Sequence, residues 1–258
     1  MTRREPAYDA VRRAGVLRVS RPGTEWLSTG WNGGRRTADA VYNVTVPDGW
    51  NRTDLDTYIA ERLEQAGFAE ASEHEQGQTD VGPALLTGAK QRDACGARCG
   101  SVTAYATAGI SNPAALPMDP DEEGEQPVSA GDEQRPGHGT VNIIVGTTKA
   151  LAPGALANLV AVAAEAKAAT LLAETGYPGT TTDAIITGHD PTGEQVSFSG
   201  SGTDVGAATR ACVREALRAT LRAHYEGCNS ELPDAVSDAP YGVSTEIRAT
   251  VFQPAFED

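Results

Sequence analysis

Short strand-like segments alternate with three long helical patterns along this chain, and this alternation limits the fold more than any other feature. Residues 140–145 have the pattern of a buried strand. After them, Pro153 suits the first turn of a helix, and Gly176 with Pro178 gives the expected stop. A further strand-like segment follows at 182–187. This order predicts an α/β fold in which helices pack on a sheet.

The other segments predict the same layered architecture. Thr53 and Asp56 resemble a capping box, before a helix that ends at Gly67. Asp204 begins the third helix. Strands are expected at residues 15–20, 24–29, 41–46, 82–87, 101–108 and 195–199, with a turn at residues 21–23 between the first two. Because the strands at 182–187 and 195–199 follow each other without a helix between them, we expect a mixed β-sheet with long helices packed on it, in a single domain over residues 1–258.

Composition restricts the partners. The 258 residues carry 21 basic and 35 acidic side chains, a net charge of −14, which argues against nucleic acid or an anionic membrane as the main partner. The few lysines are Lys90, Lys149 and Lys167, and an acid-rich, lysine-poor surface suits concentrated salt. No run of 18 apolar residues occurs, and Glu5 and Asp9 interrupt any export signal. We expect a cytoplasmic protein of a halophile.

A solvated acidic loop is predicted at about residues 114–138, which are rich in Pro, Gly, Asp and Glu. The four cysteines are too few for a disulfide scaffold in a chain of this length. Cys95 and Cys99 are spaced so that they could help to hold a metal, but no second pair accompanies them, and ordinary thiols are favoured. No metal site is predicted.

The motifs that would fix a reaction class by themselves are missing, namely the phosphate-binding loop, the Gly-x-Ser-x-Gly elbow and the His-Glu-x-x-His zinc helix. Each histidine is interpreted as solvated or structural (His74, His138, His189 and His224). The glycine-rich segment 200–206 has two interpretations of equal weight. It either holds an anion at a helix N-terminus or makes a tight turn capped by Thr203 or Asp204.

Several predicted strand ends carry the same chemistry. Residues 105–112, 146–149 and 179–183 are dense in Gly, Ser, Thr and Asn, and together they would line a site for a ligand rich in amides and hydroxyls. Three tryptophans near one another in sequence could cover a flat apolar ligand (Trp26, Trp31 and Trp50), although core packing is favoured for each.

The chain also resembles a known family, the adenosylcobinamide amidohydrolases of archaeal and bacterial corrinoid salvage. The resemblance covers most of residues 15–225 and rests on segments 27–34, 105–113, 140–146, 154–167 and 179–184. It implies hydrolysis of the amide between the aminopropanol arm and the corrin ring of adenosylcobinamide, giving adenosylcobyric acid and 1-amino-2-propanol. The substrate itself carries cobalt and no further cofactor is predicted. A related corrinoid as ligand, and homo-oligomerisation, stay open.

Roles in this reaction are assigned by position. Asp183 or Glu165 is expected to act as general base on water, and Thr181, Thr182 or Ser28 is an alternative covalent nucleophile. Lys149, or Asn112 with Asn142, would stabilise the oxyanion. The predicted catalytic set is Asp183, Glu165, Lys149 and Thr182, and the predicted substrate-binding set is Ser28, Thr29, Trp31, Asn32, Tyr105, Thr107, Ser111, Asn112, Asn142, Asn158 and Thr181.

Two other functions stay open. A corrinoid-binding protein without hydrolytic activity would share every binding feature, so only turnover separates it from the enzyme. An amidase or self-processing hydrolase of other specificity would use a threonine nucleophile from residues 180–182. Internal cleavage before a threonine would then give two chains that a mass measurement detects.

Overall fold

The computed structural model describes residues 7–47, 49–68, 81–120, 139–226, 232–239 and 241–255. Its strands are β1 (Asp9–Arg13), β2 (Val16–Ser28), β3 (Gly34–Thr45), β4 (Ala84–Thr87), β5 (Cys95–Cys99), β6 (Val102–Thr107), β7 (Ala114–Ala115), β8 (Asn142–Thr147), β9 (Ala150–Leu151), β10 (Ala184–His189), β11 (Gln195–Val196) and β12 (Val243–Ser244). Its helices are α1 (Leu55–Gln65), α2 (Pro153–Thr175) and α3 (Asp204–Glu226), with short 3₁₀ turns η1 (Gln91–Asp93) and η2 (Val236–Asp238).

One eight-stranded sheet organises the molecule, in the order β4-β3-β2-β10-β8-β6-β5 with β1 added beside β2. The pairs β10–β8 and β3–β4 are parallel, and the other pairs in this sheet are antiparallel. The expected α/β fold with a mixed sheet and three long helices is therefore confirmed. The strand β5 was not expected, because its sequence of small and polar residues lacks an apolar alternation.

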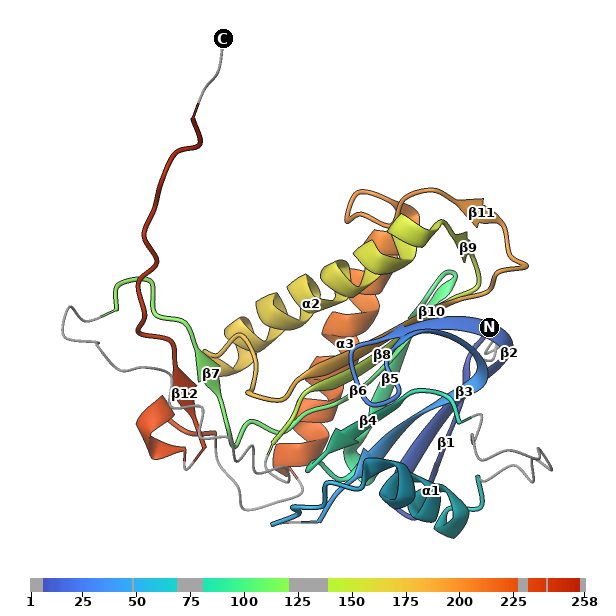
Figure 1. Ribbon diagram of the computed structural model, residues 1–258, viewed down its shortest axis with the longest axis horizontal. Helices are drawn as coiled ribbons and strands as arrows, with labels where there is room; N and C mark the ends of the chain where they lie inside the picture. The colour runs from blue at the N-terminus through green and yellow to red at the C-terminus, as the bar shows by residue number, and fades with distance from the viewer. Residues whose placement is uncertain are drawn as a thin grey trace.

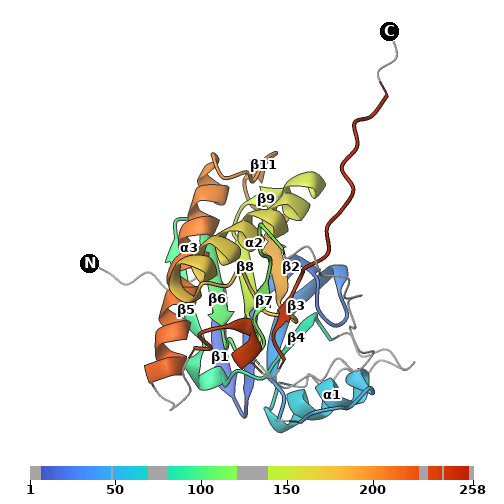
Figure 2. The same cartoon turned by 90° about the vertical axis from the view of Figure 1, so that its left-hand side faces the viewer.

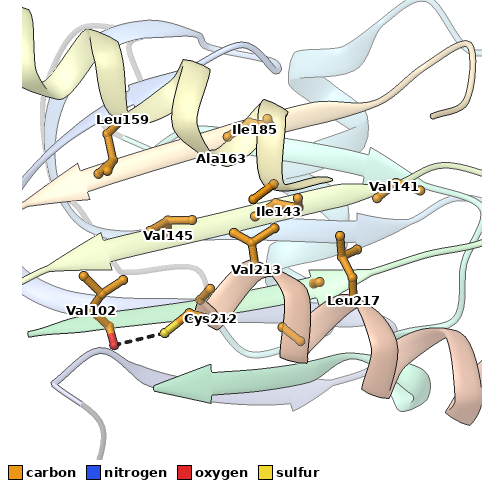
Figure 3. Packing of buried hydrophobic residues seen from close by; sticks show 14 of the residues in the cluster. Val102, Val141, Ile143, Val145, Leu159, Ala163, Ile185, Cys212, Val213 and Leu217 are labelled. Carbon is orange, nitrogen blue, oxygen red and sulfur yellow. Dashed lines mark hydrogen bonds between the residues drawn. The ribbon is translucent and has the colours of Figure 1, made fainter. Parts of the chain in front are cut away.

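Helices α2 and α3 lie side by side on one face of β6, β8 and β10 (Figures 1 and 2). Figure 3 shows Leu159 of α2 and Val213 of α3 meeting Ile143 and Val145 of β8 in this core. The Cys212 thiol also lies here, 3.6 Å from the carbonyl oxygen of Val102. Burial raises its pKa to about 12, so this cysteine is an ordinary buried thiol, as expected.

The face of β8 and β10 opposite α2 and α3 packs against residues of β2, β3 and β4, because the sheet curls back on itself. The long strand β2 pairs with β1 along its first half and with β10 along its second half. Between the two halves its register against β3 shifts, from Ser20 to Thr24. The turn expected at residues 21–23 is therefore wrong, because the strand continues through a bulge instead of reversing.

Two close approaches hold this face of the sheet together, and one of them joins paired residues of the neighbouring strands β2 and β10. The fully buried rings of Tyr8 and Trp26 lie against Gly146 and Gly188, where an added Cβ would come within 2.5 Å and 2.3 Å of them. The backbone can be approached this closely only because glycine has no side chain. Beyond these contacts, Tyr58 and other buried residues of α1 pack on β3 and β4, at the far side of the molecule from α2 and α3 (Figure 1).

The helices begin and end close to where the sequence predicts, but one of the predicted caps is absent. Pro153 begins α2, and Gly176 ends it with a left-handed conformation. Asp54, and not Thr53, precedes α1 without a side-chain capping bond, so the expected capping box is wrong. Before α3, the Thr203 hydroxyl accepts from the Gly206 N–H at 3.1 Å, which confirms the tight, capped turn.

Helix α2 is also long and apolar enough, by composition, to cross a membrane. Eight of its residues are instead buried in the molecule, among them Leu156 and Leu159, which pack against the sheet. This burial identifies α2 as a core helix.

The expected acidic loop is described only at its start. Ala114 and Ala115 form β7, which pairs with β12 near the C-terminus. Residues 121–138 lie outside the described residues, as do His74, His138 and Cys228.

Candidate active site

Three strand ends meet at one edge of the sheet. β6 runs antiparallel to β8, and β8 runs parallel to β10, so that Thr107 pairs with Asn142 and Asn142 pairs with Ala184. The loop after β6 and the loop before β10 therefore lie together. The Asn112 side-chain amide donates to the Thr181 hydroxyl at 2.6 Å, and the Thr181 N–H donates to the Asn112 carbonyl at 3.2 Å. Two of the three polar segments predicted to meet, 105–112 and 179–183, meet here, whereas 146–149 lies at the opposite end of β8.

Asp183 anchors residues 179–183, which we call the threonine loop. Its Oδ1 accepts from the Val141 N–H at 2.9 Å and from the Thr180 hydroxyl at 2.5 Å. Its Oδ2 accepts from the Thr180 N–H at 3.1 Å and from the ammonium group of Lys167. Both carboxylate oxygens are thus engaged by two donors each. A general base must release such contacts before it takes a proton, so this geometry suits a positioning role.

The threonine loop presents hydroxyl groups at the surface. Thr181 and Thr182 are exposed, and the Thr182 hydroxyl lies 2.8 Å from that of Thr140. Ser111 is exposed beside them and accepts from the Gly139 N–H at 2.5 Å. Hydroxyls from both loops can therefore meet a ligand at this edge.

A buried amide network lies directly beneath the edge. The Asn142 side-chain nitrogen donates to the Asn43 side-chain oxygen at 3.0 Å and to the Leu86 carbonyl at 2.9 Å. Asn43 in turn donates to the Thr107 hydroxyl at 2.9 Å. Among the described residues, the side-chain oxygens of Asn142 and Asn112 have no hydrogen-bond partner although both are buried. Each is available to accept from an N–H group of a ligand.

The end of β2 contributes to the same edge only in part. The Thr29 hydroxyl accepts from the Ile185 N–H at 3.0 Å, which places Thr29 beside the start of β10. Ser28 is buried and accepts from the Gly30 N–H at 3.0 Å. Trp31 and Asn32 turn the other way, since the Trp31 indole donates to Asp56 of α1 and Asn32 donates to the Val81 carbonyl.

The other two tryptophans belong to the core. Trp26 is fully buried, and Trp50 is 6% exposed and packs on the ring of Tyr58. Core packing, the favoured interpretation, is confirmed for both, and neither offers a face to a flat ligand.

Two predicted catalytic residues, Lys149 and Glu165, lie away from this edge. Lys149 follows the opposite end of β8 and pairs with Glu194. The Glu165 carboxylate pairs with Arg210 of α3 at 3.4 Å, and its side chain is 62% exposed. Glu165 and Lys167 are two positions apart in α2, so they point to different sides of the helix. The positions of Glu165 and Lys167 in the sequence do not by themselves show that only Lys167 reaches Asp183.

Asn158 and Tyr105 are also directed elsewhere. Asn158 donates to the Ser199 hydroxyl at 3.1 Å. It lies more than two helical turns before Lys167, the residue of α2 that meets Asp183. The Tyr105 hydroxyl donates to the Tyr8 carbonyl at 2.7 Å. Burial raises the pKa of Tyr105 to about 12, which keeps this phenol protonated inside the molecule.

A histidine and an aspartate that sequence reasoning missed border the edge. His224 Nδ1 lies 3.2 Å from Oδ2 of the buried Asp93. The other ring nitrogen faces Gly109, where an added Cβ would be 3.6 Å from it, and Gly109 donates to the Thr140 carbonyl at 3.3 Å. A carboxylate that orients a histidine in this way is a common arrangement for proton transfer. The two residues are 131 positions apart, so no local motif marked them.

A family model and two curated relatives point to one family. A family model described as adenosylcobinamide amidohydrolase matches residues 1–229. The adenosylcobinamide amidohydrolase of Halobacterium salinarum is 51% identical over 247 residues, which cover 96% of this chain and 100% of that protein. The protein of the same name from Methanosarcina mazei is 29% identical over 208 residues, 76% of this chain and 90% of that protein. The crystal structure of the PH0078 protein from Pyrococcus horikoshii OT3 is similar at a TM-score of 0.43 and 14% identity, over 84% of this chain and 79% of that chain.

Proposed function

This chain belongs to the adenosylcobinamide amidohydrolase family, and from that premise we propose that it hydrolyses adenosylcobinamide at the edge where β6, β8 and β10 meet. The bond cleaved is the amide between the aminopropanol arm and the corrin ring. The products are adenosylcobyric acid, which re-enters cobalamin biosynthesis, and 1-amino-2-propanol. The observation that supports the location is the meeting of Asn112, Thr181 and Thr182 at one edge. The paired His224 and Asp93 are linked to this edge through Gly109, which His224 faces and which donates to the Thr140 carbonyl.

Proton transfer is assigned to His224. Its ring takes a proton from water while the water oxygen attacks the amide carbonyl carbon, and it returns that proton to the nitrogen as the C–N bond breaks. Asp93 holds the ring through Nδ1 and stabilises the imidazolium that forms. In this assignment water is the nucleophile and His224 is the base. Asp183 only positions the threonine loop.

Substrate recognition is assigned to the unpaired amide oxygens and the exposed hydroxyls. A corrinoid carries many side-chain amides, and their N–H groups match the acceptor oxygens of Asn112 and Asn142. The hydroxyls of Thr181, Thr182 and Ser111 can donate to its carbonyls. Because these groups come from two loops fixed to each other, they are arranged before the substrate arrives.

The product assay tests the proposal directly. Purified protein is incubated with adenosylcobinamide in concentrated KCl, which screens the repulsion of an acidic surface, and the mixture is followed by mass spectrometry. We expect adenosylcobyric acid and free aminopropanol in equal amounts. Intact substrate that co-elutes with folded protein would instead support the non-catalytic corrinoid carrier. Two fragments of the chain itself, cut before a threonine, would support the threonine-nucleophile hydrolase.

We also propose that the enzyme works in the cytoplasm and needs neither a metal nor a cofactor of its own. The net charge of −14 supports a partner other than nucleic acid or an anionic membrane. Dialysis against a chelator should leave turnover unchanged, and a loss that zinc or magnesium restores would contradict this part.

A further inference from the structure

A pocket lined in part by η1, the turn that also carries Asp93 of the candidate active site, gathers positive charge. It has a volume of about 430 Å³ and opens between the β1–β2 turn, the end of β3 and η1. None of its eight lining residues is acidic. Four are cationic, namely Arg12, Arg13, Lys90 and Arg92. In a chain with 35 acidic and only 21 basic residues, such a concentration of one sign needs an explanation, because like charges repel one another across a shared pocket.

The cationic groups are held in place by the backbone. Arg12 donates to the carbonyls of Gln91, Arg92 and Ala94. Arg13 donates to the Ala66 carbonyl at 3.2 Å. These contacts fix the guanidinium groups without neutralising them, since a carbonyl carries no net charge. Within the described residues Lys90 makes no ion pair, and Arg92 pairs with Asp93 at 3.4 Å. One carboxylate beside four cationic groups leaves the pocket with an excess of positive charge.

Gln91 supplies a second and independent observation. It lines the pocket, is only 3% exposed, and neither its amide nitrogen nor its amide oxygen has a hydrogen-bond partner among the described residues. A buried polar group is nearly always paired in a native protein. An unpaired donor and acceptor at the wall of a cationic pocket therefore point to a ligand that pairs with both.

We propose that this pocket binds a phosphoryl-bearing small molecule. Lys90, Arg92 and Arg13 would hold the phosphoryl oxygens, and Gln91 would hydrogen-bond the bound molecule through both of its amide atoms. Phosphoryl groups suit this wall because they carry up to two charges and accept hydrogen bonds from guanidinium and ammonium donors. The volume is in the range of pockets for small organic ligands, so it accommodates either inorganic pyrophosphate or a phosphate attached to an organic body.

Binding is measured on the full-length protein by isothermal titration calorimetry with adenosine diphosphate, inorganic pyrophosphate and adenosine as probes. We expect one site for each of the two phosphorylated probes and none for adenosine. Tighter binding of the nucleotide identifies an organic phosphate as the occupant, and equal binding identifies the phosphoryl group alone. No corrinoid is present in this experiment, so its result does not depend on the proposed hydrolysis.

Two variants and a control locate the site. Lys90→Met and Gln91→Met should each weaken pyrophosphate binding about tenfold or more. Arg214→Gln removes one positive charge from the exposed surface of α3, where Arg214 pairs with Glu215, and should leave the affinity unchanged. Gln91→Met should also melt at the same or a higher temperature without ligand, because it removes an unpaired buried amide.

Any of three results would overturn the proposal. The first is that neither phosphorylated probe binds, and the second is that adenosine binds as tightly as they do. The third is that Lys90→Met and Gln91→Met weaken binding no more than Arg214→Gln does. Lys90 is exposed, so Lys90→Met gives a clear answer even if the buried Gln91 proves sensitive to substitution.

Discussion

The carboxylate of Asp183 and the ammonium group of Lys167 face each other where α2 passes the start of β10, with 9% and 14% of their side chains exposed. Removing one partner of so buried a pair leaves the other charge uncompensated, at a cost of about 3–5 kcal/mol. We therefore expect Asp183→Asn to lower the free energy of unfolding by about that amount in urea denaturation. The double variant with Lys167→Met should recover part of the loss. Additive losses would show that the two charges do not stabilise each other.

The same variant bears on turnover. Because Asp183 holds the threonine loop, whose hydroxyls are assigned to substrate recognition, to Val141, Asp183→Asn should weaken adenosylcobinamide binding and raise KM more than it lowers kcat. Wild-type kcat and KM for the folded variant would remove Asp183 from both the catalytic and the positioning role.

His224 gives the sharpest test of the chemistry. We expect His224→Gln to lower kcat by about 10²–10⁴-fold, the usual contribution of a general acid or base, with a smaller loss for Asp93→Asn. The matched control is Arg214→Gln on the same helix, which should retain full activity. Rates are compared at saturating substrate, alongside circular dichroism spectra. Equal rates for His224→Gln and the control would exclude the proposed proton transfer.

Glycine at position 188 is required by Trp26. An added Cβ at Gly188 would lie 2.3 Å from the buried indole ring, so Gly188→Ala should destabilise the protein by about 1–3 kcal/mol through overpacking. Gly154 is the control, since no atom lies within 4 Å of the corresponding position in the first turn of α2. Gly154→Ala should leave the melting temperature unchanged or raise it. A normal melting temperature for Gly188→Ala would show that the paired strands β2 and β10 can adjust at this point.

The pH dependence of stability has a defined sign at Asp190. Hydrogen bonds from Thr192 and then from Arg21 lower the pKa of this carboxyl from its ordinary 3.8 to about 2. A lowered pKa means that the folded state favours the ionised form, so this stabilisation is fully present above about pH 4 and is lost as the pH falls through about 2. The difference in unfolding free energy between wild type and Asp190→Asn should shrink over that interval. A difference that stays constant with pH would contradict the pairing.

The fold was largely predictable because its strongest signals are local. Pro153 and Gly176 delimit α2 by their own backbone preferences, and the apolar run at β8 indicates a buried strand without reference to any partner. The bulge in β2 was missed, since residues 21–23 favour a turn as much as a bulge and only pairing with β3 decides between them.

The candidate site was predictable only where its residues follow strand ends. Asn112 and Thr181 meet because the sheet order brings two such ends together. Lys149 and Glu165 look equally polar in sequence, but strand direction and helix phase point them elsewhere. The pair of Asp93 and His224 forms through packing of α3 on η1, which no spacing in the sequence indicates.

The division of β2 between two partner strands also sets an order for folding on the ribosome. Its first half can pair with β1 and β3 as soon as these neighbours are made. Its second half also pairs with β3, but its other edge stays unpaired until β10 is made, and beside it Thr29 bonds to Ile185 across 156 positions. Contacts so distant in sequence form slowly, and until then half of β2 is an open edge able to pair with another chain. Nascent chains of this protein are therefore most prone to aggregate before β10 has been synthesised.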